Sequence, residues 1–99
     1  MISIVVPVYN DPDGIRTTLE SLLSQTATNY RIVIVDNDST DRTPDIIRSY
    51  DDNRITLVHE TEIQSSYAAR NTGIRTTDSD LLAFVDADMT VPEDWLESA

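Results

Sequence analysis

The segment Leu81-Leu82-Ala83-Phe84-Val85-Asp86-Ala87-Asp88 runs from five apolar residues straight into two carboxylates that are separated by one residue. A short, uninterrupted apolar run of this kind predicts a β-strand. Asp86 and Asp88 then follow the strand end, where both acids can share a divalent cation or bind a cation and a ligand hydroxyl. Mg²⁺ and Mn²⁺ take such oxygen ligands and often bridge to substrate phosphates.

Two other apolar segments also end in polar residues. The segment 2–8 runs into Tyr9-Asn10, and the segment 30–35 runs into Asp36-Asn37-Asp38-Ser39. Ligands of parallel α/β sheets bind beyond the carboxyl ends of the strands. The three polar strand ends therefore predict one shared site rather than scattered surface acids.

Helical patterns separate the predicted strands. A helix with Asp11 as its N-cap and one apolar stripe extends to about Gln25. The other elements predicted from the pattern are a helix that begins near Thr43-Pro44, a strand at 55–59, a helix at 64–76, a turn at 78–80 and a helix start at 91–96. This βαβαβαβ order predicts an α/β fold of three layers (α/β/α) with a mainly parallel sheet and right-handed crossovers.

Some packing can be predicted within the last two helices. In the helix at 64–76, we expect Tyr67, Ala68 and Ile74 to be buried, and Gly73 would allow close packing of this helix on the sheet. The helix around Trp95 has no following element on which to pack. This suggests a fragment, or a domain completed by something absent from the sequence.

The composition is strongly acidic. Eighteen acids face seven bases in 99 residues, the net charge is −11, and every base is an arginine. Such a charge argues against nucleic acid or an anionic membrane as a partner. An acidic surface without lysine is similar to that of proteins from salt-loving organisms, where a Debye length of about 3 Å at 1 M salt screens the self-repulsion.

Two absences from the sequence exclude further classes of site. There is no cysteine, which excludes disulfides, thiolate metal sites and a cysteine nucleophile. No segment approaches the ~20 apolar residues of a transmembrane helix, so no membrane segment is predicted in this chain. The length fits one small domain or a part of a larger one.

Four motifs in this order resemble those of family 2 glycosyltransferases: Val5-Val6-Pro7-Val8-Tyr9-Asn10, Val35-Asp36-Asn37-Asp38-Ser39-Thr40-Asp41, Ala69-Arg70-Asn71-Thr72-Gly73-Ile74 and Phe84-Val85-Asp86-Ala87-Asp88. The resemblance covers the whole chain. It implies the Rossmann-like front part of a GT-A fold and an inverting enzyme that uses nucleotide diphosphate sugars. Residues 1–99 would be the nucleotide-sugar-binding part of the glycosyltransferase domain, truncated at the C-terminus.

The resemblance also implies which residues bind the nucleoside. Pro7 and Tyr9 would line the base pocket. The next residue, Asn10, could belong to the same pocket or could equally be a turn residue beside Asp11-Pro12. Asp36 and Asn37 occupy the place of two acids, or of an acid and Asn, one of which bonds the pyrimidine ring or the ribose. An amide can donate as well as accept a hydrogen bond. Asn37 at the second position is a departure that bears against the usual uridine contact and leaves thymidine and guanosine nucleotides open.

The segment Asp86-Ala87-Asp88 matches the DxD motif of the family. By resemblance, Asp86 contacts the ribose, and Asp88 coordinates the Mg²⁺ or Mn²⁺ bound to the diphosphate, with Asp86 as a second candidate ligand. A cation stabilises the charge that develops on the departing diphosphate. Arg70 would pair with an acid of the site, approach the diphosphate or pair locally on the helix surface, and Asn71 would brace the site by bonding to backbone.

Inverting transfer needs a general base that deprotonates the acceptor hydroxyl. The family supplies this base and the acceptor pocket from the later half of the domain, so no catalytic residue is assigned within residues 1–99. We expect this chain alone to bind nucleotide weakly without transferring sugar. The resemblance implies a polysaccharide, lipid-linked glycan or protein acceptor, and a cytoplasmic enzyme that works at the inner face of the membrane.

Two alternatives stay open from the residues. Asp86-Ala87-Asp88-Met89-Thr90 also fits the strand-end motif of haloacid-dehalogenase-like phosphatases, in which Asp86 would be the nucleophile and Mg²⁺ the cofactor. That motif normally opens its domain, and a phosphatase would not account for the segment 6–10. The second alternative is a non-catalytic acidic α/β module, which would have no reason to hold a metal ion at Asp88.

Overall fold

The computed structural model describes residues 1–77 and 81–98, apart from the side chains of Ser66 and Ser98. The elements follow the predicted order: β1 (Ile2–Val8), α1 (Pro12–Leu23), β2 (Tyr30–Asp36), α2 (Thr43–Arg48), β3 (Ile55–His59), α3 (Ser66–Thr76), β4 (Leu81–Phe84) and α4 (Trp95–Ser98). The predicted turn at 78–80 lies outside the described residues.

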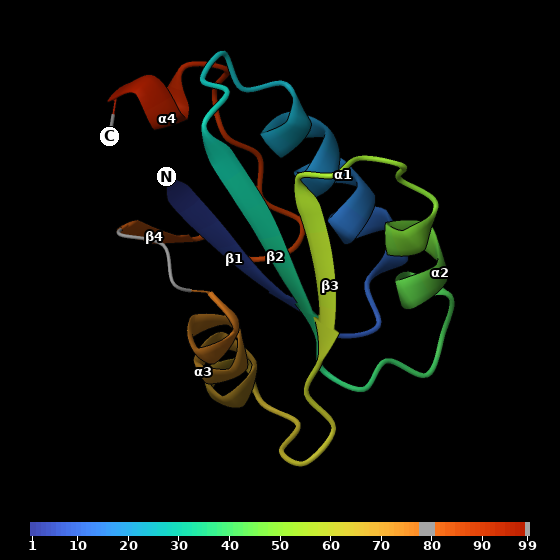
Figure 1. Ribbon diagram of the computed structural model, residues 1–99. Coiled ribbons are helices and arrows are strands. Elements are labelled where there is room, and N and C mark those ends of the chain that lie inside the picture. The colour runs from blue at the N-terminus through green and yellow to red at the C-terminus, as the bar shows by residue number, and fades with distance from the viewer. Residues whose placement is uncertain (78–80, 99) are drawn as a thin grey trace.

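The sheet separates two helical layers, as predicted. Within the described residues, the four strands are parallel and lie in the order β3-β2-β1-β4, with α1 and α2 on one face and α3 on the other (Figure 1). Alternate side chains of β1 and β2 enter opposite layers. Ile4 and Val6 pack with the apolar stripe of α1, whereas Val5 and Val35 pack with Ala69 of α3. Burial on both faces explains why these strands are continuously apolar.

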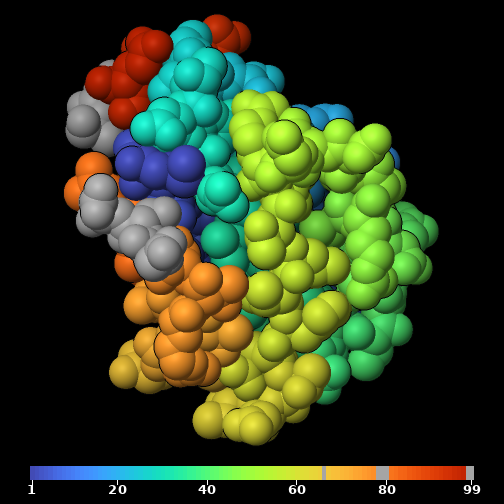
Figure 2. Space-filling view, in the orientation of Figure 1, coloured from blue at the N-terminus to red at the C-terminus, as the bar shows by residue number. Residues whose placement is uncertain are grey.

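The register of the strands aligns their carboxyl ends. Val8 at the end of β1 pairs with Asp36 at the end of β2, and Asp36 pairs with His59 at the end of β3. In Figure 1 this edge is the lower one, and Figure 2 shows the segment 60–65 and α3 side by side beneath it. The polar residues that follow the strands therefore gather at one edge of the sheet.

Helix α3 packs on the sheet through small residues, which corrects part of the sequence prediction. Ala68 is buried as predicted, but Tyr67 is 74% exposed and Ile74 is 41% exposed. The face that meets the sheet carries Ala69 and Gly73 instead. These two residues are four apart and so lie one above the other on the helix. Their small size brings the helix backbone close to β1, and the two larger side chains are left on other faces.

We expect Gly73→Ala to lower the free energy of unfolding by about 1–3 kcal/mol, the usual range for overpacking. A Cβ on Gly73 would lie 2.4 Å from Cγ1 of Val5, which is fully buried in β1. Urea unfolding measures the loss. Val5→Ala removes the clashing methyl, so the double variant should be more stable than the sum of the two single losses. Strict additivity would mean that this contact does not limit the position.

The C-terminal segment packs on the end of α1, an element that precedes it in the chain. Gln25 donates through Nε2 to the Pro92 carbonyl at 2.6 Å and accepts through Oε1 from the Leu96 N–H at 3.0 Å. Leu96 is buried, and Trp95 packs against the same apolar core as α1. The sequence pattern missed this because the residues that meet are about 70 positions apart.

Several element boundaries differ from the prediction by one to four residues, including α4, which begins at Trp95 rather than at 91. Helix α1 ends at Leu23 rather than near Gln25, and α3 begins at Ser66, where the Ser65 hydroxyl accepts a hydrogen bond from the Ala68 N–H. β4 ends at Phe84, although the Val85 N–H still donates to the Val5 carbonyl. In the described part of the chain, no helix has the length and apolar character needed to cross a membrane.

Candidate functional site

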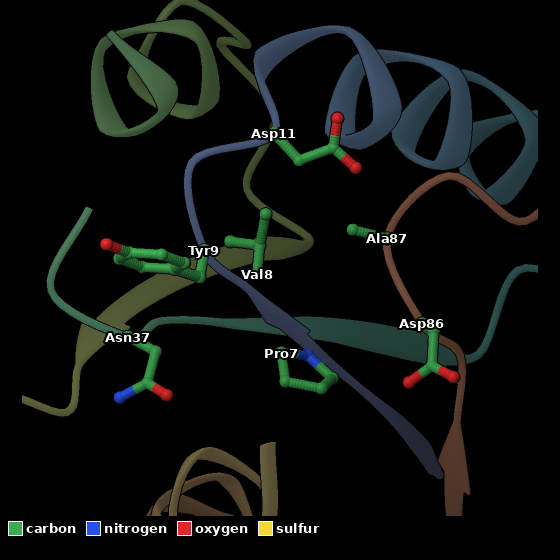
Figure 3. A pocket seen from close by; sticks show the side chains of 7 residues that line it. All are labelled: Pro7, Val8, Tyr9, Asp11, Asn37, Asp86 and Ala87. Carbon is green, nitrogen blue, oxygen red and sulfur yellow. The ribbon is translucent and has the colours of Figure 1, made fainter. Parts of the chain in front are cut away.

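An open cavity of about 210 Å³ lies beyond the carboxyl ends of β1, β2 and β4 (Figure 3). Its lining residues come from all three strand ends: Pro7, Val8, Tyr9, Asp11, Asn37, Asp86 and Ala87. Pockets that enclose drug-sized ligands measure roughly 300–1,000 Å³. This cavity therefore has room for only a part of a nucleotide sugar. In Figure 3, Tyr9 and Asn37 lie on one side of it, and Asp86 and Ala87 lie on the other.

The end of β1 supplies an apolar wall and an aromatic ring. Pro7 is buried in the strand, whereas Tyr9 is 46% exposed beside the cavity. Within the described residues, no hydrogen bond holds the Tyr9 hydroxyl. Such a residue offers a flat apolar face together with a free polar group.

Asn37 is held by its own amide group. Its Nδ2 donates to the Glu60 carbonyl at 3.1 Å and to the Ile63 carbonyl at 2.9 Å, and its backbone N–H donates to the Val8 carbonyl at 2.9 Å. Because both side-chain partners are acceptors, they fix which end of the amide is nitrogen. Figure 3 shows the oxygen on the side of Pro7 and the nitrogen turned away. Asn37 thus offers only an acceptor to the cavity.

The turn at 60–63 that holds Asn37 is organised by the carboxylate of Glu60. This carboxylate accepts hydrogen bonds from the Thr72 hydroxyl and from the backbone N–H groups of Ile63 and Glu62. The bond from Thr72, followed by those from Ile63 and Glu62, lowers the pKa of Glu60 below its usual value. The charged carboxylate therefore keeps the two carbonyls directed at the Asn37 amide.

The opposite side of the cavity carries a positive and a negative charge. Nη2 of Arg70 lies 3.0 Å from Oδ1 of Asp86, and both side chains are partly exposed. An ion pair with an acid of the site was one of the roles that we predicted for Arg70. Two residues further on, Asp88 is exposed, has φ of 75° and donates its backbone N–H to the Gly14 carbonyl at 3.2 Å. Aspartate is among the residues that tolerate this left-handed conformation.

The two acids fit a cation that is shared with a phosphate ligand, rather than one enclosed by protein. Among the described residues, no group of three or more His, Cys, Asp or Glu side chains could hold a metal ion. Mg²⁺ commonly binds through only one or two carboxylates and completes its octahedron with water and substrate phosphates. Asp86 and Asp88 are of the residue type that such a site uses, and their binding of a cation stays a prediction.

Comparison with known proteins identifies the family of this chain. The sequence model of glycosyl transferase family 2 matches residues 3–99. The chain belongs to this family. Glycosyltransferase AglE of Haloferax volcanii is 39% identical to it over 100 residues, which cover 97% of this chain and 33% of that protein. The chain thus spans about a third of the length of this relative.

Two solved structures have the same fold. The mannosyltransferase PcManGT from Pyrobaculum calidifontis, in complex with GDP-Man and Mn²⁺, has a TM-score of 0.87 and 32% identity over 96% of this chain and 30% of its own. S. aureus TarS 1–349, in complex with UDP-GlcNAc, has a TM-score of 0.84 and 29% identity over 98% of this chain and 29% of its own. The family 2 chain therefore has the Rossmann-like front part of the GT-A fold, and the comparisons give no support to a phosphatase.

The structure does not bring every predicted site residue of this family 2 chain to the cavity. Asp36 is buried behind it, where Oδ2 accepts from the Ser39 N–H at 3.2 Å and lies 3.5 Å from Nδ1 of His59. Asn71 is half-buried and lines a separate depression over the segment 60–65. Asp88 lies just outside the lining residues.

Two lining residues were not predicted from the sequence. Val8 and Asp11 both border the cavity. Asp11 was identified only as the N-cap of α1, and its Oδ1 does accept from the Gly14 N–H at 3.0 Å. Its position directly after the polar end of β1 was the signal that could have placed it at the site.

Proposed function

We propose that this chain is the donor-binding part of an inverting glycosyltransferase, which transfers a sugar from a nucleotide diphosphate sugar to an acceptor hydroxyl. The observation that carries the proposal is the single cavity shared by Tyr9, Asn37 and Asp86 at the ends of three strands. A base can lie against the Tyr9 ring beside Asn37, and the diphosphate can then extend toward Asp86. Pro7 and Ala87 would complete the walls.

The hydrogen bonds of Asn37 support a base with a ring N–H group. Since both Nδ2 protons are directed at backbone carbonyls, only Oδ1 is available to a ligand. Uracil, thymine and guanine each carry a ring N–H donor, whereas cytosine and adenine present a ring acceptor at the corresponding position. We therefore infer that UDP, dTDP or GDP sugars are preferred as donors over CDP and ADP sugars, whose bases could donate to Oδ1 only through an exocyclic amino group. The ligands of TarS and PcManGT, UDP-GlcNAc and GDP-Man, both have such a base.

We further propose that the DxD acids bind Mg²⁺ or Mn²⁺ together with the diphosphate. When bound, the cation would neutralise charge on the departing nucleoside diphosphate. Asp88 would be the principal ligand, and Arg70 would hold Asp86 in position through their ion pair. Charge supports a need for the cation, because a chain of net charge −11 repels an anionic nucleotide.

Asp36 and Asn71 have supporting roles in this proposal. Asp36 accepts from the Ser39 N–H and so stabilises the loop that follows Asn37. Asn71 belongs to the α3 face beside the turn at 60–63. Neither side chain borders the cavity, so we assign neither a contact with the nucleotide.

For the whole enzyme, we infer only the class of acceptor and the cellular location. We propose a polysaccharide, lipid-linked glycan or protein acceptor, and an enzyme in the cytoplasm at the inner face of the membrane. The acidic, lysine-free surface supports adaptation to high salt, which would screen its self-repulsion. The general base and acceptor pocket are expected beyond residues 1–99.

A nucleotide screen tests this function. Calorimetric titration with UDP, dTDP, GDP, CDP and ADP, each with Mn²⁺ in high salt, is expected to give binding for at least one of the first three and weaker binding for the last two. Binding of none of the five would reject the donor-binding role. Preferential binding of ADP or CDP would reject the role of Asn37. Incubation with a panel of sugar donors is expected to give no transfer by this chain.

A further inference from the structure

Asn10 joins two loops that are distant in sequence. Its backbone N–H donates to the Ser39 hydroxyl at 2.9 Å, its Nδ2 donates to the Thr40 hydroxyl at 3.3 Å, and its Oδ1 accepts from the Thr40 N–H at 2.8 Å. These three hydrogen bonds, which we call the Asn10 bridge, span about 30 positions of sequence. They tie the turn between β1 and α1 to the loop between β2 and α2.

The bridge lies directly beyond the two residues that form one side of the cavity. Tyr9 precedes Asn10, and Asn37 precedes the loop that contains Ser39 and Thr40. A second link joins the same two segments on the strand side: the Asn37 N–H donates to the Val8 carbonyl at 2.9 Å. Tyr9 and Asn37 are therefore enclosed between two cross-links, one at Val8 and the other at Asn10. This arrangement fixes the backbone separation across that side of the cavity.

Tyr9 depends on this backbone attachment for its position. Its side chain is half-exposed, and in the described part of the chain its hydroxyl makes no hydrogen bond. Asn37, by contrast, is buried and held through its own amide. The distance from the Tyr9 ring to Oδ1 of Asn37 is therefore set mainly by the turn that Asn10 holds.

We propose that Asn10 is a positioning residue for the nucleobase, which holds the Tyr9 ring at the distance from Asn37 that a base requires. This inference rests on the proposed function and adds a residue to it that touches no ligand. The bridge acts on the base side of the cavity, away from Arg70, Asp86 and Asp88. Its loss should weaken binding of the nucleoside by the same factor with or without the diphosphate and its cation.

A glycine substitution separates positioning from a simple turn role. Asn10 has φ of 46°, a left-handed conformation that Asn tolerates and that Gly adopts without strain. Asn10→Gly therefore keeps the turn and the backbone N–H but removes both side-chain hydrogen bonds to Thr40. If Asn10 served only as a turn residue, this variant would bind nucleotide as the wild type does.

The test compares binding of UMP and GMP without metal, and of UDP and GDP with Mn²⁺, in wild type and Asn10→Gly. We expect the variant to lose about tenfold in affinity for the monophosphate that the wild type binds, as for one or two lost hydrogen bonds, and the same factor for the diphosphate. Amide hydrogen exchange at Thr40 should become at least about tenfold faster without any nucleotide, because its acceptor is gone. The thermal midpoint should fall by only a few degrees, because the lost hydrogen bonds are exposed.

Two further variants serve as controls. Asp38 also has a left-handed backbone, with φ of 67°, and its exposed side chain makes no hydrogen bond among the described residues, so Asp38→Gly should not weaken binding. Asn10→Asp keeps an oxygen acceptor for the Thr40 N–H and should recover part of the affinity. Equal losses in Asn10→Gly and Asp38→Gly, or unchanged binding by Asn10→Gly, would overturn the positioning role alone. A wild type that binds no nucleotide would overturn the proposed function, and the positioning role with it.

Discussion

Asn37→Asp is expected to lose about 3–5 kcal/mol of the free energy of unfolding at pH 7, the range for a buried charge left without a partner. The size of the effect is unexpected from the resemblance, because the family often carries an acid at this position. In this chain, however, the side chain is 3% exposed and donates to the carbonyls of Glu60 and Ile63. An ionised carboxylate only accepts hydrogen bonds. It would face two carbonyl oxygens and repel both.

The loss of stability should depend on pH in a defined direction. Burial beside two carbonyls disfavours the charged form, so the new carboxyl would take up its proton more readily in the folded chain than in the unfolded chain. The deficit relative to wild type should therefore be small below the unfolded pKa of about 3.9 and should grow as the pH rises above it. Urea unfolding of both proteins at pH 4 and pH 7 measures this difference.

A matched control adds the same charge elsewhere. Asn29 is exposed in the loop before β2, so Asn29→Asp should change the stability by about 0.5 kcal/mol or less. If Asn37→Asp were as stable as wild type at pH 7, the amide of Asn37 could not be what holds the turn at 60–63. The inference that Asn37 offers only an acceptor to the base would then lose its basis.

Asp88→Asn is expected to abolish the effect of Mn²⁺ on nucleotide binding. Without a cation, the diphosphate of UDP or GDP faces Asp86 and Asp88, so the diphosphate should bind no more tightly than the nucleoside monophosphate. With Mn²⁺, we expect wild type to bind the diphosphate about 10–100-fold more tightly than without it, about 1.4–2.7 kcal/mol. The variant should lose this gain and keep its affinity for the monophosphate.

The choice of asparagine keeps the backbone of the site. Asp88 has a left-handed φ of 75°, which Asn adopts more readily than Ala does. Asp38→Asn is the control, because Asp38 is also an exposed acid with a left-handed backbone, and it lies outside the cavity lining. Calorimetric titrations with and without Mn²⁺ compare the three proteins. A Mn²⁺ effect that survives in Asp88→Asn, or disappears equally in Asp38→Asn, would reject Asp88 as the principal ligand.

Local patterns in the sequence were sufficient to predict the elements and their order. The apolar runs of β1 and β2 indicate burial on both faces, and the apolar stripe of α1 repeats at the helical period. Parallel strands then place Tyr9, Asn37 and Asp86 at one edge, whatever the details of packing. The general position of the site followed from the same argument. The close approach of Gly73 to the sheet was predicted separately, from a glycine within a helical segment.

What the residues do at that edge depended on contacts between distant parts of the chain. The sequence alone determined that Asn37 is an amide, but only the fold directs its donors at Glu60 and Ile63, 23 and 26 positions away, and leaves its oxygen to the cavity. Likewise, the sequence left open whether Asn10 is only a turn residue, and the fold places Ser39 and Thr40 beside it. Tyr67 was predicted to be buried and is exposed because the small residues of α3 face the sheet. Periodicity reports which residues share a face of one element, whereas hydrogen-bond partners and packing faces are set by which elements meet.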